Sequence, residues 1–479
     1  MVRRMRKRLQ ACGLLAALAW AASAPAQSPG PEAPSLTLDA AIERALEHNR
    51  DLVKGALDLQ GQRLAEEQAR EAARDIRIVP EGAAGVGPGG ADWSAGARAE
   101  ATGSYGTRVA VGAAARQIEV EGASDLRREE VRVEVSQPLL RNFGPLVRNE
   151  PVVAAGENGL AARRAWERDR SALVVRVVEL YEGLIYLRRQ IESDEAFAAR
   201  MERMWMLAGA REQQGKASRT EVLRMDLQRG EAASRLETER SQLDIQFLEF
   251  ADVLGLPLDS TFRLTPPAML DLDVREADRA LAVALDERPD YAQALQDIET
   301  GDRRLRLARR NLLPDLQLSA RQTTFGEGAE WSDAGRLDQD DWFVGLAADM
   351  NLNLRGARLE IARAGVDAEA RRQVAEIVRH RLAIEVSSGL AAYRRARAEV
   401  GLAGRNLELA ANRAELARAL FEAGRAGADS VSDAEADRIR AELSELAARR
   451  EASVSAYRLL HVLGTLVPAP REILRNEKE

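Results

Sequence analysis

Residues able to carry out chemistry are few in this sequence. The three histidines, His48, His380 and His461, stand far apart, and none has a partner at the spacing of metal ligands. No serine or cysteine arrangement suggests a catalytic triad. The glycine-rich stretch from Gly82 lacks the lysine and hydroxyl of a phosphate-binding loop, so we expect only a flexible lead there. The sequence therefore predicts a protein that is not an enzyme and that uses no metal or cofactor.

The N-terminus has the pattern of a secretory signal peptide. Basic residues precede an apolar stretch at 11–22, and small residues ending at Ala26 form a cleavage site. Cleavage near Ala26 would remove the only cysteine, Cys12, and five positive charges, which takes the net charge from −7 to −12. The exported chain would have no disulfide, and its acidity predicts that it does not bind nucleic acid. No later stretch approaches 18 consecutive apolar residues, so no transmembrane helix is expected.

Long helices must form most of the chain. Charged residues make up 30% and aromatic residues only 4%, a composition typical of long packed helices. Apolar residues at 173–191 step alternately by four and three, as in a coiled-coil seam, and the pattern recurs 209 residues later at 382–400. A helix over about 356–421 would extend for about 100 Å.

Two glycines separate these long helices from shorter returning ones. Gly215 and Gly424 are 209 residues apart, and so are the later pairs Leu254-Gly255 and Leu463-Gly464. The shared offset predicts two repeats, each with an antiparallel helical hairpin whose tip lies near one glycine. The expected organisation is a signal peptide at 1–26, a first repeat at 27–254, a linker or strap at 255–273, a second repeat at 274–466 and a C-terminal tail at 467–479.

Before each long helix the apolar period changes from 3.5 to 2. Valines alternate with polar residues at 131–135, and a longer alternation covers 342–354. Weaker alternations at 97–118 and 316–323 supply partners, so we predict one strand hairpin per repeat, at about 97–138 and 316–354. Such strands suit a lipid-facing barrel, although a half-buried sheet in a soluble domain has the same pattern.

Export without a helical anchor, and rods too long for a compact core, favour the barrel. Four strands cannot close a barrel alone, and open strand edges are not tolerated in lipid. Two copies would give eight strands, which side chains fill, whereas three would give twelve and leave a lumen. We therefore predict a trimer with a shared 12-stranded transmembrane barrel.

Several motifs together resemble the TolC-like outer-membrane efflux protein family. They are "LTLDAAIERALEHNRDL" and its counterpart "ADRALAVALDERPDY", then "SQPLL", "RRNLLPDLQLSA" and the two glycine turns. The resemblance implies a mostly α fold with a small β part: a homotrimeric 12-stranded barrel in the outer membrane of a Gram-negative bacterium, continued by a periplasmic α-helical barrel. It also implies an exit duct of a tripartite efflux or type I secretion system, which receives substrates from an inner-membrane transporter through a periplasmic adaptor.

The resemblance assigns roles to the two hairpin tips. They would be the periplasmic ends of the duct and would contact the adaptor through Gly215, Lys216, Gly424 and Gly427. The alternative for the glycines is an ordinary role as helix stops.

In the family, acidic residues just past the glycine narrow the entrance. Glu221 matches such an acid, and Asp429 and Asp433 are its counterparts in the second turn, where Ser430 departs from the pattern. Three copies of these acids around a narrow pore would favour cations. The alternative is that they are solvated residues supporting a helix dipole.

The family also closes this entrance with a tyrosine and an arginine. Phe421 stands at the tyrosine position, so it can pack but offers no hydroxyl. Ala426 occupies the arginine position, with Arg425 one residue early. Any contact that closes the entrance of this protein must therefore use other side chains than the tyrosine and arginine of the family. The alternative to the whole interpretation is a periplasmic coiled-coil adaptor or scaffold without a membrane barrel.

Overall fold

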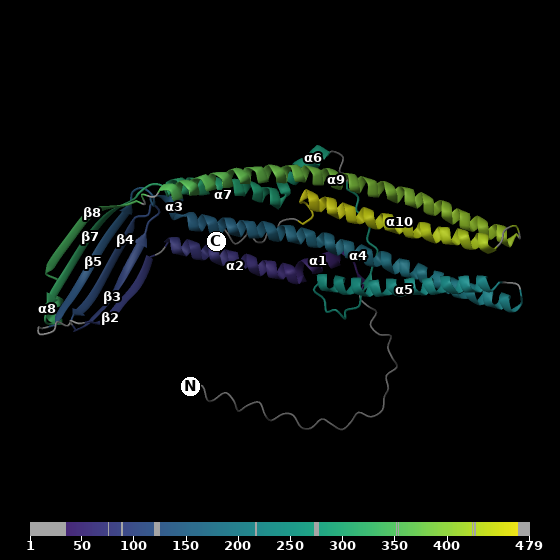
Figure 1. Ribbon diagram of the computed structural model, residues 1–479, viewed down its shortest axis with the longest axis horizontal. Coiled ribbons are helices and arrows are strands. Elements are labelled where there is room, and N and C mark those ends of the chain that lie inside the picture. Colours follow the sequence, from purple (N-terminus) through teal and green to yellow (C-terminus); the bar gives the residue numbers. More distant parts are fainter. Residues whose placement is uncertain are drawn as a thin grey trace, which may run out of the picture.

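The computed structural model describes residues 35–467, apart from 75, 88–89, 119–124, 216–217, 273–276, 351, 353, 424 and 426–427. A sheet lies at one end, and long helices extend from it to the opposite end (Figure 1). The first half of the chain contains β1 (Ser35–Leu36), α1 (Leu38–His48), α2 (Arg50–Arg74), β2 (Ile76–Gly87), β3 (Gly90–Thr102), β4 (Arg108–Ile118), β5 (Leu126–Pro138), α3 (Pro145–Arg148), α4 (Glu150–Gln213) and α5 (Arg219–Val253). The second half contains β6 (Arg263–Leu264), α6 (Ala277–Glu287), α7 (Pro289–Arg310), β7 (Asp315–Gly328), α8 (Trp331–Ala334), β8 (Gln339–Asp349), α9 (Leu354–Glu422) and α10 (Ala428–Leu463).

The predicted rods are the helices α4 and α9. They have 64 and 69 residues, so each extends for about 100 Å. Helix α5 returns along α4 and α10 returns along α9, and both hairpins turn at the end farthest from the sheet (Figure 1). Within the described part of the chain, no helix combines the length and apolarity needed to cross a membrane.

The expected coiled-coil seams are buried. In α4 they include Val177 and Leu184, both with no exposed surface, and in α9 they include Leu382 and Val386. The largest core lies midway along the rods, where α1 and the end of α5 cover α4, and where Tyr181 meets Phe250 edge to face. Shorter helices cover the sheet-side part of each rod, α2 on α4 and α7 on α9.

Two glycines make the same tight contact in the two halves. Gly255 and Gly464 both have positive φ, 65° and 77°, which favours glycine because a Cβ would clash. A Cβ on Gly255 would lie 2.3 Å from the carbonyl oxygen of His48, at the end of α1. On Gly464 it would lie 3.0 Å from the carbonyl oxygen of Glu287, at the end of α6. The leucine-glycine pairs therefore stop the returning helices and let the short helices approach.

A strap crosses α4 near the main core. Strand β6 pairs in parallel with β1, and the hydroxyl of Tyr181 lies between them. This hydroxyl is 2.8 Å from the carbonyl oxygen of Leu36, and the backbone N–H of Thr265 donates to it at 3.1 Å. The segment joining the two halves is thereby fixed to the middle of the rod.

The sheet has six strands, in the order β2-β3-β4-β5-β7-β8, and every adjacent pair is antiparallel. The prediction of four strands per chain is therefore wrong. The segment 97–118 is not one strand but parts of β3 and β4, with a turn at 103–107. The stretch from Gly82 is not a flexible lead but part of β2.

The sequence predicted too few strands for two reasons. The side chains on the two faces of β2 and β3 differ little in polarity, and the turn between β3 and β4 was overlooked. Strands β2 and β3 are rich in alanine and glycine, so their alternation is faint. The turn between β3 and β4 is marked by Gly106, with φ of 87°, and by a ring contact between Tyr105 and Phe143. The second hairpin was predicted well, except that β8 ends at Asp349 and the rod begins at Leu354, within the segment predicted as strand.

Candidate functional site

The register of the sheet separates its residues onto two faces. One row crosses all six strands on one face and contains only apolar residues: Ile76, Ala101, Val109, Val135, Ala320 and Val344. We call this side, continued by every second residue along each strand, the apolar face. Ile76 and Val344 are 73% and 61% exposed. A broad apolar surface left open in this way marks a site of contact with another protein or with a membrane.

The opposite side of the sheet, which we call the polar face, carries paired charges. Arg128 in β5 bonds Glu327 in β7 at 2.8 Å and Glu130 in its own strand at 3.2 Å. Arg132 bonds the same Glu130 at 2.9 Å. These side chains lie on alternate positions of β5, between the valines of the apolar face. The sheet can therefore separate an apolar medium from water.

The first hairpin tip joins α4 to α5. Its stop is Gly215, in the left-handed region with φ of 70°, whose N–H donates to the carbonyl oxygen of Glu212 at 2.8 Å. The Glu212 carboxylate also bonds Arg219 at 3.4 Å, across the turn. Further from the tip, the Arg229 guanidinium lies 4.2 Å from the ring centroid of Trp205. These contacts hold the end of α4 against the start of α5 at this tip.

The second hairpin tip joins α9 to α10. Among the residues whose side chains the structure describes, its buried cluster consists of three alanines, Ala414, Ala417 and Ala434. Two ion pairs flank the cluster, Arg413 with Asp437 and Arg418 with Glu435. Such pairs are worth little when exposed, and alanine buries little area, so this tip is held weakly compared with the middle of the rod.

The residues predicted at the entrance that the structure describes lie in or beside the two tips. Arg425 is exposed in the second turn, where its N–H donates to the carbonyl oxygen of Leu420 at 2.8 Å. Ser430 and Asp433 are exposed in the first turns of α10. The others fall as follows: Gly215 in the first turn, Glu221 in α5, Phe421 in α9, Asp429 in α10, and Lys216, Gly424, Ala426 and Gly427 outside the described residues.

A carboxylate pair inside the first hairpin was not predicted. Asp194 of α4 and Glu239 of α5 are both nearly buried and share Arg235, at 3.3 Å and 3.2 Å. Gln190 also donates to Glu239 at 2.6 Å. Asp194 occupies the position between Ile191 and Ala198 in the coiled-coil seam, where an acid interrupts the apolar pattern. That interruption is the sequence signal that could have revealed it.

The pair is expected to hold one proton. Burial raises the pKa of Asp194 to about 6, and a shared hydrogen bond with Glu239 adds to this. Burial alone would raise the pKa of Glu239 too, but hydrogen bonds from Asp194, Arg235 and Gln190 lower it. The folded chain therefore keeps a proton on Asp194 at a pH where the unfolded chain has lost it.

Asp194→Asn should stabilise the hairpin at neutral pH. Because the folded pKa of Asp194 is raised, the contribution of this carboxyl to stability is full below about pH 4 and is lost as the pH rises through about 6. The asparagine avoids this loss, since it needs no proton to donate to Glu239. We expect a gain on the order of 2 kcal/mol at pH 8 and none at pH 4. Thermal midpoints followed by circular dichroism at both pH values measure it.

The matched control is Glu195→Gln, the next residue along α4. Glu195 is exposed and paired with Arg240 at 2.6 Å, so its neutralisation should change the midpoint little at either pH. An Asp194→Asn midpoint that follows the wild type at both pH values would contradict the shared proton.

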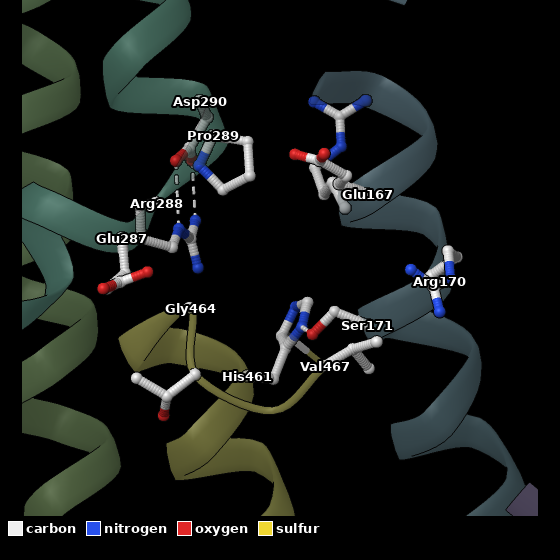
Figure 2. A pocket seen from close by; sticks show the side chains of 12 residues that line it. Glu167, Arg170, Ser171, Glu287, Arg288, Pro289, Asp290, His461, Gly464 and Val467 are labelled. Carbon is white, nitrogen blue, oxygen red and sulfur yellow. Dashed lines mark hydrogen bonds and ion pairs between the residues drawn. The ribbon is translucent and has the colours of Figure 1, made fainter. Parts of the chain in front are cut away.

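A hollow of about 250 Å³ lies where α4, the α6–α7 junction and the end of α10 meet (Figure 2). The Ser171 hydroxyl lies 2.7 Å from Nδ1 of His461 in this hollow, and burial, reinforced by the nearby Arg288, lowers the pKa of His461. Asp290 makes a two-pronged contact with Arg288, at 3.0 Å and 2.6 Å. This carboxylate is thus engaged with arginine rather than set behind the histidine, as a hydrolase triad requires. The hollow is lined by helices from both halves of the chain.

No metal-binding group of histidine, cysteine, aspartate and glutamate occurs among the described residues. Two other features stand out in the described part of the chain: the two-faced sheet at one end and the hairpin tips at the other.

Comparison with known proteins agrees with this geometry. Residues 280–465 match the family described as outer membrane efflux protein. No curated protein matches the sequence. Solved structures match over nearly the whole chain, including the outer-membrane channel OprN, at 17% identity and a TM-score of 0.66, covering 89% of this chain and 90% of that chain.

Two further structures extend the comparison. The outer membrane protein VceC from Vibrio cholerae has 17% identity and a TM-score of 0.64, covering 89% of this chain and 96% of that chain. The CmeC outer membrane channel of Campylobacter jejuni has 13% identity and a TM-score of 0.68, covering 92% of this chain and 89% of that chain. The predicted resemblance is confirmed: residues 280–465 match the family described as outer membrane efflux protein, and the chain shares the fold of these outer-membrane channels over most of its length.

Proposed function

We propose that this protein is the outer-membrane exit duct of an export system. The observation that carries the proposal is the sheet with one apolar and one charged face, attached to rods about 100 Å long. The apolar face suits lipid and the polar face suits a water-filled lumen. The rods suit a periplasmic barrel of helices that continues the lumen toward the inner membrane.

The duct must contain more than one chain. A single sheet of six strands leaves β2 and β8 paired on one side only, and open edges are not tolerated in lipid. The family resemblance favours three chains, which would also bring three copies of each hairpin tip together. We propose a homotrimer in the outer membrane, with the signal peptide removed near Ala26.

The partners follow from the position of the tips. An adaptor in the periplasm would contact the turns at Gly215 and Gly424, and would connect the duct to an inner-membrane transporter. We propose a tripartite efflux or type I secretion system, in which the transporter selects the cargo. The competing proposal, a periplasmic scaffold, has no use for a broad exposed apolar sheet face.

The experiment that tests the duct has two parts. We expect the mature protein to stay with outer membranes after a carbonate wash and to have the mass of three chains when extracted in detergent. A monomer that washes off the membrane would overturn the proposal and support the scaffold.

Asp433→Ala should weaken cation selectivity. Asp433 is exposed near the second tip, and three copies around a narrow entrance would attract cations and repel anions. We expect the cation preference in bilayer conductance recordings to fall about two-fold or more, and the effect to be lost at high salt. Asp437→Ala is the control, because that carboxylate is engaged with Arg413. Unchanged selectivity would remove Asp433 from the proposed acidic entrance.

A further inference from the structure

The hairpin formed by β2 and β3 is the part of the sheet that a four-strand architecture lacks. Its strand β3 pairs with β4 in a continuous register, from Asp92↔Ile118 to Thr102↔Arg108. Strand β2 pairs with β3 over its full length, from Ile76↔Ala101 to Gly87↔Gly90. The hairpin is therefore a continuous part of the sheet.

The apolar face continues across this hairpin. Ile76, Ile78 and Val86 of β2 lie on that face, and they are 73%, 76% and 89% exposed. Trp93 of β3 lies on the same face near the end far from the helices, where its ring centroid is 5.6 Å from that of Trp331 in α8. Trp342 of β8 also lies on this face, in the register row of Ala99. Strands β2 and β3 thus have the same two-faced character as the other four.

The edges of the six-stranded sheet are complementary to each other. Each neighbouring pair is antiparallel, so an even number of strands makes β8 run opposite to β2. Both edge strands are long enough to span a membrane, with 12 residues in β2 and 11 in β8. A head-to-tail ring of identical chains can therefore join β8 of one to β2 of the next by an antiparallel ladder. Pro80, in β2, lacks a donor and costs this ladder at most one hydrogen bond.

We propose that three copies of this chain close an 18-stranded barrel, with β2 of each chain paired to β8 of the next. The inference rests on the proposed outer-membrane trimer and adds which edges meet. If β4 were the edge instead, the hairpin β2–β3 would lose its ladder to β4, and the exposed side chains of Ile76, Ile78 and Val86 would be left without lipid contact.

The extra strands widen the duct. At about 4.8 Å between strands and a tilt of about 40°, 18 strands give a backbone diameter of about 36 Å, against about 24 Å for twelve. Barrels of this strand number leave an aqueous channel. The outer-membrane part would therefore admit wider cargo than a 12-stranded barrel.

Disulfide cross-linking tests which edges meet. The only cysteine is Cys12, in the predicted signal peptide, so 27–479 is a cysteine-free background. We would pair Ile78→Cys with Val344→Cys, Leu346→Cys or Ala348→Cys, all on the apolar face. In one chain β2 and β8 are five strand spacings apart, about 24 Å, so a disulfide between them must join two chains.

The controls use strand β4. Val111→Cys with Val133→Cys, which are register partners in β4 and β5, reports whether the reagent reaches the apolar face. Val109→Cys with Val344→Cys or Leu346→Cys joins chains only if β4 is the edge. Covalent trimers from the β2–β8 pairs support the proposal. Cross-links from the β4–β8 pairs overturn it, as does an intact trimer with no β2–β8 cross-link while the β4–β5 control reacts.

A reconstruction of the detergent-extracted wild-type trimer gives a second readout without any substitution. Eighteen strands in cross-section support the proposal and twelve overturn it. A protein that is monomeric and washes off membranes would instead overturn the proposed duct itself, so the two failures are distinguishable.

Discussion

Replacing Val133 by arginine is expected to abolish assembly of the protein in the outer membrane. Val133 lies midway along β5 on the apolar face, between Val111 and Gln322 of the neighbouring strands. An arginine facing lipid at the bilayer midplane costs about 2–4 kcal/mol, and the proposed trimer carries three copies, for a total on the order of 10 kcal/mol. Outer-membrane fractionation after expression, followed by immunoblotting of the trimer, measures the loss.

The matched control places the same arginine on the other face. Ala110 lies in β4 on the polar face, directly opposite Glu134 of β5. Ala110→Arg would meet that carboxylate in water, so we expect trimer yields close to wild type. Equal yields for Val133→Arg and Ala110→Arg would contradict the assignment of the two faces.

Among substitutions that add one methyl group in the helical part, Gly255→Ala is expected to cause the largest loss of stability. The new Cβ would lie 2.3 Å from the carbonyl oxygen of His48, and alanine would have to keep a φ of 65°. Left-handed backbone costs alanine about 1–2 kcal/mol and forced overpacking about 1–3 kcal/mol. We expect a loss of about 2–5 kcal/mol, read as a fall in the thermal unfolding midpoint of the mature protein.

Two other glycines calibrate this result. Gly464→Ala meets Glu287 at 3.0 Å with a similar φ, so it should lower the midpoint in the same direction by less. Gly230→Ala lies in open space within α5, where alanine favours the helix by about 1 kcal/mol. A midpoint for Gly255→Ala equal to that for Gly230→Ala would show that α1 does not pack against this turn.

The helices were the part of the fold that sequence patterns predicted best. Apolar steps of four and three over many turns have one simple solution, and α9 was predicted at about 356–421 against Leu354–Glu422 observed. The equivalent stops at Gly255 and Gly464 follow the predicted offset of 209 residues. That the two halves arose by duplication stays a prediction. A duplication requires the same order of elements in both halves, but the same order does not by itself show a common origin.

The sheet was harder because its pattern is faint where side chains are small. Valines made β5 obvious, whereas alanines and glycines in β2 and β3 offered little contrast between faces. The 22 residues at 97–118 were too long for one membrane strand, and Gly103 and Gly106 were the missed turn signals. Those two glycines account for one of the two missed strands, and the faint alternation of β2 accounts for the other.

The positions of the hairpin turns could be predicted from sequence, but the contacts around them could not. Glycines indicated where the second hairpin reverses, and Ser430 and Asp433 lie in the first turns of α10 beside it, while their role at an entrance stays a prediction. Contacts between side chains of two different helices cannot be predicted from the sequence of one chain alone. Asp194 and Glu239 are 45 residues apart and meet only because α5 folds back on α4.

The three-alanine cluster under the second tip implies a gradient of local stability along the rods. Ala414, Ala417 and Ala434 bury little apolar area, whereas Tyr181, Phe250 and Leu184 fill the middle of the molecule. Fraying of the last turns of α9 and the first turns of α10 therefore costs far less free energy than global unfolding. We expect the tip to separate and close again by thermal motion while the remainder of the chain stays native, so dilation of the proposed entrance would need no rearrangement of the main core.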